Sequence, residues 1–400
     1  MLTAEQNDEL TDFAAGTPMG ELLRRYWHPV ATLSELDATP VLPVRILGED
    51  LVVYRNEAGE LGLVQRNCAH RGASLEFGMP EAEGLRCAYH GWVYDSTGKC
   101  IEQPAEPGGK GFANRVSITA YPVQALGGLA WAYLGPAPAP LLPRYDLFVA
   151  DRYERSIGIT RELPANWFQM MENSLDPVHL EYLHGRFYNY VLARQGKPPR
   201  AIVRRHLRIG FDVFDFGIIK RRILEGQTEE SDEWKIGHPI LFPNILAVGD
   251  YDLPEFQIRV PIDDTHTQYY WYRCKVPDDP KAARQTTIPH WDNPYRDQNG
   301  HLIVDTVNGH DLTIFIAQGA IADRTNERLG TSDAGVVLLR KVFREQLERI
   351  AQGLDPMAVV RDPARNTIID VPREHKAHYT IGGAFLEGSK VETMNIGATW

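Results

Sequence analysis

Two short pairs of cysteine and histidine constrain the fold of this chain more than any other sequence feature. One residue separates Cys68 from His70, two residues separate Cys87 from His90, and 16 residues lie between the pairs. Short spacing lets two side chains of one loop reach one metal centre, and a glycine shortly after each pair permits the sharp turn that a ligand loop needs. Thiolates with imidazoles hold either a tetrahedral zinc ion or a two-iron cluster in which two histidines replace two cysteines.

The mixed spacing of these pairs favours the iron cluster, because zinc-ribbon pairs usually place both ligands two to four residues apart. A structural zinc site stays open as the main alternative, and unrelated buried residues are a weaker one. The two remaining cysteines, Cys100 and Cys274, have no ligand partner nearby in sequence and are expected to be small core residues. Four cysteines in 400 residues are too few for a disulfide framework.

Composition excludes several classes of function. Lys and Arg total 42 against 53 Asp and Glu, a net charge of −11, so the chain lacks the basic field that non-specific nucleic-acid binding requires. No run approaches about 18 uninterrupted apolar residues, and the N-terminus is polar and acidic, unlike a secretory signal. We therefore expect a cytoplasmic protein that binds neither nucleic acid nor membranes.

The first third of the chain is predicted to be a small β domain behind a helical segment. Residues 7–26 carry apolar side chains at helical spacing, and short β-like runs punctuated by turns follow them. A proline-rich stretch at residues 135–143 cannot continue a β-ladder. We therefore divide the chain into a helical segment at 1–26, a β domain at 27–140 and a second domain at 141–400.

The second domain is predicted to combine helices with a large sheet. Residues 166–184 are helix-like, with Asn166 as a plausible cap and Pro177 opening or kinking a second helical segment. Long β-like runs over residues 200–275 predict a large curved sheet, and an amphipathic helix over 332–353 can cover one of its faces. The fold class is α+β.

The cysteine and histidine pairs resemble a known signature. Cys-Ala-His-Arg-Gly followed by Cys-Ala-Tyr-His-Gly-Trp is similar to the signature of the Rieske [2Fe–2S] domain, which is a β domain. The resemblance implies that Cys68 and Cys87 bind one iron of the cluster and that His70 and His90 bind the other. The family often has proline at the position of Ala69, which is not a ligand position.

His179 and His184 form a second candidate metal site. They lie five positions apart, and on an ideal helix this spacing turns two side chains about 140° away from one another. A wider, π-like turn after Pro177 would bring both imidazoles to one side, and such turns are frequent at functional sites. Taken alone, such a pair is more often ordinary core or surface histidines. A Rieske cluster, however, moves one electron and requires a destination for it.

The residues around this pair extend the resemblance over nearly the whole chain. Asn173-x-x-Asp176-x-x-His179-x-x-x-x-His184 resembles the mononuclear iron motif of Rieske non-haem iron oxygenase α subunits. Two histidines and one carboxylate hold Fe(II) on one face and leave positions for dioxygen and substrate. Asp176 can accept the ring N–H of His179, and helix capping is its alternative role. In the family this aspartate also contacts a Rieske histidine of the neighbouring subunit, here His90.

The carboxylate ligand must come from elsewhere in the chain. Asp305, Asp311 and Asp323 are the candidates, and this stretch resembles the phthalate-dioxygenase-like branch, in which an aspartate at the start of the helix is the third ligand. That position corresponds to Asp311, for which helix capping is the alternative role. The usual glutamine one turn later is replaced here by Phe315.

The resemblance implies the terminal oxygenase component of a multicomponent Rieske oxygenase, with a helix-grip catalytic domain that has a large antiparallel sheet. Its cofactors would be a [2Fe–2S] cluster and mononuclear Fe(II), and it would assemble as a homotrimer or a dimer of trimers. Electrons would come from NADH through a separate flavin and iron–sulfur reductase, in agreement with the lack of a G-x-G-x-x-G loop after a strand. The reaction would be hydroxylation or oxidative O-demethylation of an aromatic, carboxylated compound. A non-catalytic electron carrier with an appended ligand-binding domain is the alternative.

Basic residues between Arg204 and Arg222 are candidates for contact with a substrate carboxylate. Neighbouring strand residues point to opposite faces, so at least one of Lys220, Arg221 and Arg222 should face inward and at least one should face solvent. An inward arginine could bind a carboxylate through two hydrogen bonds. Solvated charges on the sheet are the alternative.

Overall fold

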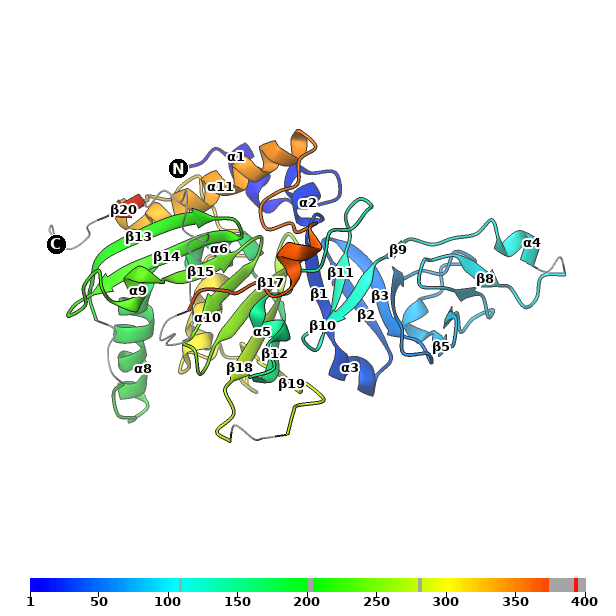
Figure 1. Ribbon diagram of the computed structural model, residues 1–400, viewed down its shortest axis with the longest axis horizontal. Coiled ribbons are helices and arrows are strands. Elements are labelled where there is room, and N and C mark those ends of the chain that lie inside the picture. The colour runs from blue at the N-terminus through cyan, green and yellow to red at the C-terminus, as the bar shows by residue number, and fades with distance from the viewer. Residues whose placement is uncertain (108–109, 201–203, 280–282, 374–391, 395–400) are drawn as a thin grey trace.

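A computed structural model describes residues 1–107, 110–200, 204–279, 283–373 and 392–394. Three small antiparallel sheets occupy one end of the elongated molecule, and a nine-stranded sheet covered by helices occupies the other (Figure 1). The predicted α+β fold class is confirmed. No helix within the described ranges is long and apolar enough to cross a lipid bilayer.

The small sheets follow the turn signals of the sequence. Gly48 and Gly59 take φ of +78° and +85° in the turns that join consecutive antiparallel strands, and Gly98, at +80°, closes the hairpin that follows the second cysteine–histidine pair. Positive φ carries little steric cost for glycine. The sheets have the orders β1-β11-β10, β2-β3-β4-β9 and β5-β6-β7-β8. Their strands are β1 Trp27–Thr32, β2 Val41–Ile46, β3 Glu49–Arg55, β4 Leu61–Gln65, β5 Met79–Glu81, β6 Gly84–Arg86, β7 Val93–Tyr94, β8 Cys100–Glu102, β9 Ala120–Tyr121, β10 Val123–Leu126 and β11 Leu129–Tyr133.

The large sheet is antiparallel, as predicted, except for one parallel pair at its edge. Its order is β19-β12-β18-β17-β16-β15-β14-β13-β20, and only the edge pair β12–β19 is parallel. A late segment returns to the sheet and adds this edge strand beside β12. The strands are β12 Glu154–Leu163, β13 His206–Phe214, β14 Gly217–Leu224, β15 His238–Leu241, β16 Ile245–Val248, β17 Glu255–Asp263, β18 His266–Lys275, β19 His290–Asp292 and β20 Glu392–Met394.

Helices cover one face of this sheet. As predicted, the Asn166 side chain caps α6 by accepting a hydrogen bond from the Phe168 N–H. The long helix α11 packs closely at Gly335, where a Cβ would lie 2.2 Å from the carbonyl oxygen of Leu175 and 2.6 Å from the Phe211 ring. The α-helices are α1 Ala4–Thr11, α2 Pro18–Leu23, α3 Leu33–Ala38, α4 Lys110–Ala113, α5 Asp146–Val149, α6 Trp167–Ser174, α7 His179–Glu181, α8 Tyr188–Arg194, α9 Asp232–Lys235, α10 Val307–Ala317 and α11 Ala334–Ala351.

The N-terminal segment is two helices rather than one helical stretch over residues 7–26. Thr3 caps α1, and Thr17 caps α2 with Pro18 at its first position, so each helix has its own start signal. Both helices lie near α11, on the side of the molecule that holds the large sheet, and α2 lies near β1 (Figure 1). Leu10 and Leu22 are fully buried in the largest hydrophobic core.

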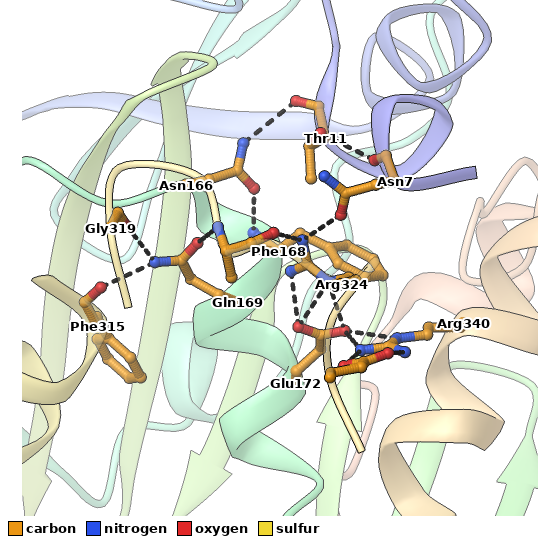
Figure 2. Close-up of polar contacts among 12 residues, drawn as sticks. Asn7, Thr11, Asn166, Phe168, Gln169, Glu172, Phe315, Gly319, Arg324 and Arg340 are labelled. Atoms are coloured by element: carbon orange, nitrogen blue, oxygen red, sulfur yellow. Dashed lines mark hydrogen bonds and ion pairs between the residues drawn. The ribbon is translucent and has the colours of Figure 1, made fainter. Parts of the chain in front are cut away.

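A buried ionic network joins these helices. Glu172 of α6 forms an ion pair at 2.7 Å with Arg324, which follows α10. It forms another at 2.6 Å with Arg340 of α11 (Figure 2). Arg324 also donates to the Asn7 side chain of α1 at 3.0 Å. Both arginine side chains are at most 6% exposed. A buried charge is stable only when paired and hydrogen-bonded, so the network fixes α6 relative to three other segments.

Gln169 links α6 to the end of α10. Its Nε2 donates to the carbonyl oxygens of Phe315 at 2.8 Å and Gly319 at 2.9 Å, and its Oε1 accepts from the Ala322 N–H at 2.8 Å (Figure 2). The side chain is buried. A saturated buried amide of this kind holds two helices in one register.

Candidate metal centres

His179, His184 and Asp311 converge beside the large sheet. One ligand atom from each lies within 4.8 Å of the others, and no other group of three histidine, cysteine or acidic residues in the described ranges meets this criterion. Asp311 Oδ1 lies 3.1 Å from His184 Nε2 and 3.8 Å from His179 Nε2. Two imidazole nitrogens and one carboxylate oxygen around one point are a ligand set for Fe(II).

A π-helical segment brings the two histidines together. α7 is followed directly by a π-helix over Tyr182–Phe187 and then by α8. The wider turn overcomes the divergence that a regular helix would impose on residues five apart, and the two rings have centroids 5.2 Å apart. The π-like turn predicted from the spacing is therefore confirmed.

The structure distinguishes the three candidate aspartates. Thr306 caps α10 by accepting from the Gly309 N–H, so Asp311 is free of the capping role that the sequence left open. Asp305 instead pairs with Lys197 at 3.2 Å. Asp323 accepts hydrogen bonds from residues of its own loop. Only Asp311 of the three reaches the histidine pair.

Asp176 does not accept the ring N–H of His179 through its carboxylate, which corrects that expectation. The acceptor at 2.6 Å from His179 Nδ1 is the main-chain carbonyl oxygen of Asp176, whereas the carboxylate Oδ2 lies 3.6 Å away. The other carboxylate oxygen accepts from the Val178 N–H at 2.9 Å. Burial acts to raise the pKa of Asp176, but His179, the Val178 N–H and Lys220 outweigh it, and the pKa lies below its usual value.

His310 is a site residue that the sequence reasoning missed. It is fully buried, and its Nδ1 lies 3.3 Å from Nδ1 of His184. Its Nε2 lies 3.0 Å from the carbonyl oxygen of Val304. Burial, with the neighbouring His184, lowers the pKa of His310. Its position directly before Asp311 was the signal that could have identified it.

The residues fit a metal ion at this point. Asp311 Oδ1 is buried and has no hydrogen-bond partner among the described residues. Leaving a buried carboxylate oxygen unpaired costs free energy, and a cation between this oxygen and the two imidazoles removes that cost. The donor set of two nitrogens and one oxygen suits iron better than the softer metals that prefer thiolates.

The second candidate centre lies between two loops at the far end of the molecule. The rings of His70 and His90 have centroids 4.5 Å apart, and the His70 ring stacks on Trp92 at the same separation. Cys68 and Cys87 are buried, whereas the two histidines reach the surface. The structure thus brings the two histidines together, and it brings the side chains of Cys68 and Cys87 into contact with each other.

Each loop turns at the glycine that follows its pair, since Gly72 and Gly91 take φ of +71° and +74°. Burial and the neighbouring Cys68 raise the pKa of the Cys87 thiol, so a thiolate here needs the positive charge of a metal centre. Tyr94 Oη accepts from the Ala69 N–H and lies at hydrogen-bond distance, 3.2 Å, from Cys68 Sγ.

The basic stretch differs from its prediction. Lys220 and Arg221 are both buried, and Arg222 is only partly exposed. Arg221 pairs with Asp212, and Arg222 pairs with Glu233, so neither is a solvated charge nor an open clamp. The buried basic side chain on the site side is instead Lys220, which donates to the carbonyl oxygen of Ser174 at 2.9 Å.

Comparison with known proteins identifies the chain. Residues 26–122 match the Rieske [2Fe-2S] domain family. The oxygenase subunit of 5,5'-dehydrodivanillate O-demethylase from Sphingobium sp. (strain NBRC 103272 / SYK-6) is 44% identical, with 99% of this chain and 91% of the relative covered. The chain belongs to the Rieske oxygenase family. This Rieske oxygenase chain is also 32% identical to the phthalate 4,5-dioxygenase oxygenase subunit of Pseudomonas putida, with 88% of each covered.

Solved structures show the same fold. Pseudomonas putida CBB5 NdmA matches with a TM-score of 0.59 at 21% identity, covering 87% of this chain and 94% of that one. The terminal oxygenase of carbazole 1,9a-dioxygenase from Nocardioides aromaticivorans IC177 matches with a TM-score of 0.58 at 19% identity, covering 86% and 96%. The Rieske oxygenase chain is therefore an oxygenase subunit with a [2Fe–2S] cluster and a mononuclear iron, and not a non-catalytic carrier.

Proposed function

We propose that this Rieske oxygenase chain removes a methyl group from a methoxylated aromatic acid. The observation that carries the proposal is the convergence of His179, His184 and Asp311, which are the proposed ligands of Fe(II). The 44% identity to a dehydrodivanillate O-demethylase subunit supports the aryl methyl ether as substrate. Iron bound there supplies the redox chemistry that activates dioxygen. Dioxygen, two electrons and two protons convert the ether to a phenol, formaldehyde and water.

The proposed cluster ligands are Cys68, Cys87, His70 and His90. The pairing of buried cysteines with surface histidines supports this assignment, because electrons must enter and leave at the surface. We propose that the electrons come from NADH through a separate flavin and iron–sulfur reductase. A cytoplasmic location stays a prediction of the sequence.

Electron transfer between chains is part of the proposal. The Rieske loops around β5–β8 and the catalytic helices α8 and α10 lie at opposite ends of one chain (Figure 1), which supports transfer to the iron of a neighbouring chain in a homotrimer or a dimer of trimers. Tyr89, beside His90, and Tyr182, between the iron histidines, are both more than half exposed. Exposed aromatic side chains of this kind are typical of protein interfaces.

A buried cation pair supports an acidic substrate. Lys220 Nζ and Arg259 Nη1 both donate to Ser174, two residues before Asp176. Both side chains are buried, and the carboxylates of Asp176 and Asp311 raise the pKa of Lys220 by less than its burial lowers it. Buried positive charge that is only partly compensated favours binding of an anion. We propose that this pair attracts the substrate carboxylate toward the iron site.

A substrate panel tests the proposed reaction. Purified protein with a reductase, NADH and oxygen is offered matched aromatic acids with and without a methoxy group, and phenol product and formaldehyde are measured together. Equal release of phenol and formaldehyde from the methoxylated acids supports O-demethylation. Diol or ring-hydroxylated product without formaldehyde would instead show ring hydroxylation and contradict the proposal.

A further inference from the structure

His310 lies directly behind a proposed iron ligand. It belongs to the second turn of α10, is fully buried, and packs against the rings of Phe187 and Tyr188. Its two ring nitrogens have different neighbours: Nδ1 faces Nδ1 of His184, and Nε2 faces the carbonyl oxygen of Val304. For a neutral His310, these contacts assign the proton positions on both rings.

The assignment starts from Val304, because a carbonyl oxygen can only accept a hydrogen bond. His310 Nε2 must therefore carry a proton, which leaves Nδ1 of the neutral ring with a lone pair. His184 Nδ1 then donates to that lone pair across 3.3 Å. The remaining nitrogen of a neutral His184, Nε2, is left unprotonated, and this is the atom 3.1 Å from Asp311 Oδ1.

Two acceptors consequently face one another at the proposed iron position. Neither His184 Nε2 nor Asp311 Oδ1 has a proton to place between them, and Asp311 Oδ1 has no hydrogen-bond partner in the described ranges. Such a pair repels unless a cation lies between the two atoms. The arrangement therefore prepares the site for metal before any metal arrives.

We infer that His310 is a positioning residue that sets the tautomer and the orientation of His184, and that the Val304 carbonyl oxygen fixes His310 in turn. This inference rests on the proposed ligand set. His179 is held in a similar way, since its Nδ1 lies 2.6 Å from the Asp176 carbonyl oxygen. Both ligand histidines thus donate to neutral acceptors rather than to carboxylates, which limits the negative charge that they pass to the metal.

Substitution of His310 tests the inference. His310→Leu removes the acceptor at similar volume, and His310→Asn keeps an oxygen near the position of Nδ1. Losing such an outer partner typically costs about 10- to 100-fold in metal affinity. We expect His310→Leu to weaken Fe(II) at the mononuclear site by this factor, with unchanged Rieske absorbance, and His310→Asn to recover most of the affinity. Titration of iron-depleted protein against a competing Fe(II) chelator measures both.

Leu312→Ala is the matched control, because it opens a cavity in the same helix one residue beyond Asp311 without touching either histidine bond. It should lower the unfolding temperature while leaving Fe(II) affinity within about threefold. Equal loss of affinity in Leu312→Ala and His310→Leu would overturn the inference, as would wild-type affinity in His310→Leu or failure of His310→Asn to recover it. If the wild-type protein binds no iron at this site, the proposed function itself fails.

Discussion

In the proposed iron site, different groups of a single residue can serve iron binding and electron delivery. Asp176 contributes its main-chain carbonyl oxygen to the orientation of His179, while its carboxylate is 3.6 Å from that ring and 30% exposed. The carboxylate is therefore available for a second role. Contact with His90 of a neighbouring chain is the role that the family resemblance implies.

Asp176→Asn should slow electron transfer without removing iron. The substitution leaves the main-chain acceptor of His179 in place and removes only the carboxylate charge. We expect both metal centres to stay loaded and reoxidation of the reduced cluster, in the presence of substrate and oxygen, to slow by about tenfold or more. Stopped-flow absorbance of the pre-reduced protein measures this step. Reoxidation at the wild-type rate would show that Asp176 has only a structural role.

Lys220 makes the stability of the protein depend on pH. Burial lowers its pKa to about 7, with Arg222 acting in the same direction. An unfolded lysine has a pKa of about 10.4, so the folded state binds the proton less tightly than the unfolded state does. The lysine therefore lowers the free energy of unfolding, and this destabilisation grows as the pH falls from about 10 to 7. Below about pH 7 the lysine is protonated in both states, and its effect on the free energy of unfolding no longer changes.

Lys220→Met should therefore raise the free energy of unfolding at pH 7, by up to about 1–4 kcal/mol, the range seen when buried ion pairs are replaced by apolar side chains. The gain should shrink toward pH 10. Urea unfolding at both pH values provides the measurement. A gain that is the same at pH 7 and pH 10 would show that the lysine is not desolvated.

Some of the site residues could be predicted from the sequence. The four proposed cluster ligands, the two proposed iron histidines and Asp311 carried enough spacing and motif information to be named. His310 and Lys220 did not, because their importance comes from burial and from partners far away in sequence, such as Ser174 for Lys220. The same reason explains why strand alternation predicted an inward side chain among Lys220, Arg221 and Arg222 but did not show which of the three it would be.

Among the elements, α6 is the helix that links the segments holding the proposed iron ligands. Its Glu172 joins two arginines, and its Gln169 binds the end of the helix that holds Asp311. The histidines follow shortly after the same helix. The distance between the two halves of the proposed ligand set is thereby fixed by one element.

Glu172→Gln should destabilise the fold strongly. It leaves the buried Arg324 without a carboxylate, while Arg340 keeps its pair with Glu327, and breaking a buried pair from one side costs about 3–5 kcal/mol. Asp355→Asn is the control, since its pair with Arg361 is well exposed and such pairs are worth at most about 1 kcal/mol. Denaturant unfolding compares the two variants, and similar losses would mean that the network contributes little.

Elements with strong local signals were predictable. The π-helical segment followed from the five-residue spacing, and the hairpins followed from glycines such as Gly98 at positive φ. The split of the N-terminal segment into two helices depends on the Thr17-Pro18 start signal, which the apolar spacing alone did not reveal. The parallel edge strand β19 required long-range pairing that no local pattern encodes.

On the scale of the whole molecule, the account requires cooperation between chains, because the two proposed centres lie at opposite ends of one chain (Figure 1). One variant, His90→Ala, should lack the cluster, and another, Asp311→Ala, should lack the mononuclear iron. A mixed trimer of the two should regain activity that neither variant has alone. Co-expressed, doubly tagged protein provides such mixed trimers. Confirmed mixing without regained turnover would contradict transfer between chains.

The central claim is that each chain holds a Rieske cluster and a separate iron at His179, His184 and Asp311. Iron and acid-labile sulfide measured per chain in wild type and in Asp311→Ala test it most directly. We predict about three irons and two sulfides in wild type, and about two irons with an unchanged Rieske spectrum in Asp311→Ala. Two irons in fully loaded wild type, or three in Asp311→Ala, would contradict the account.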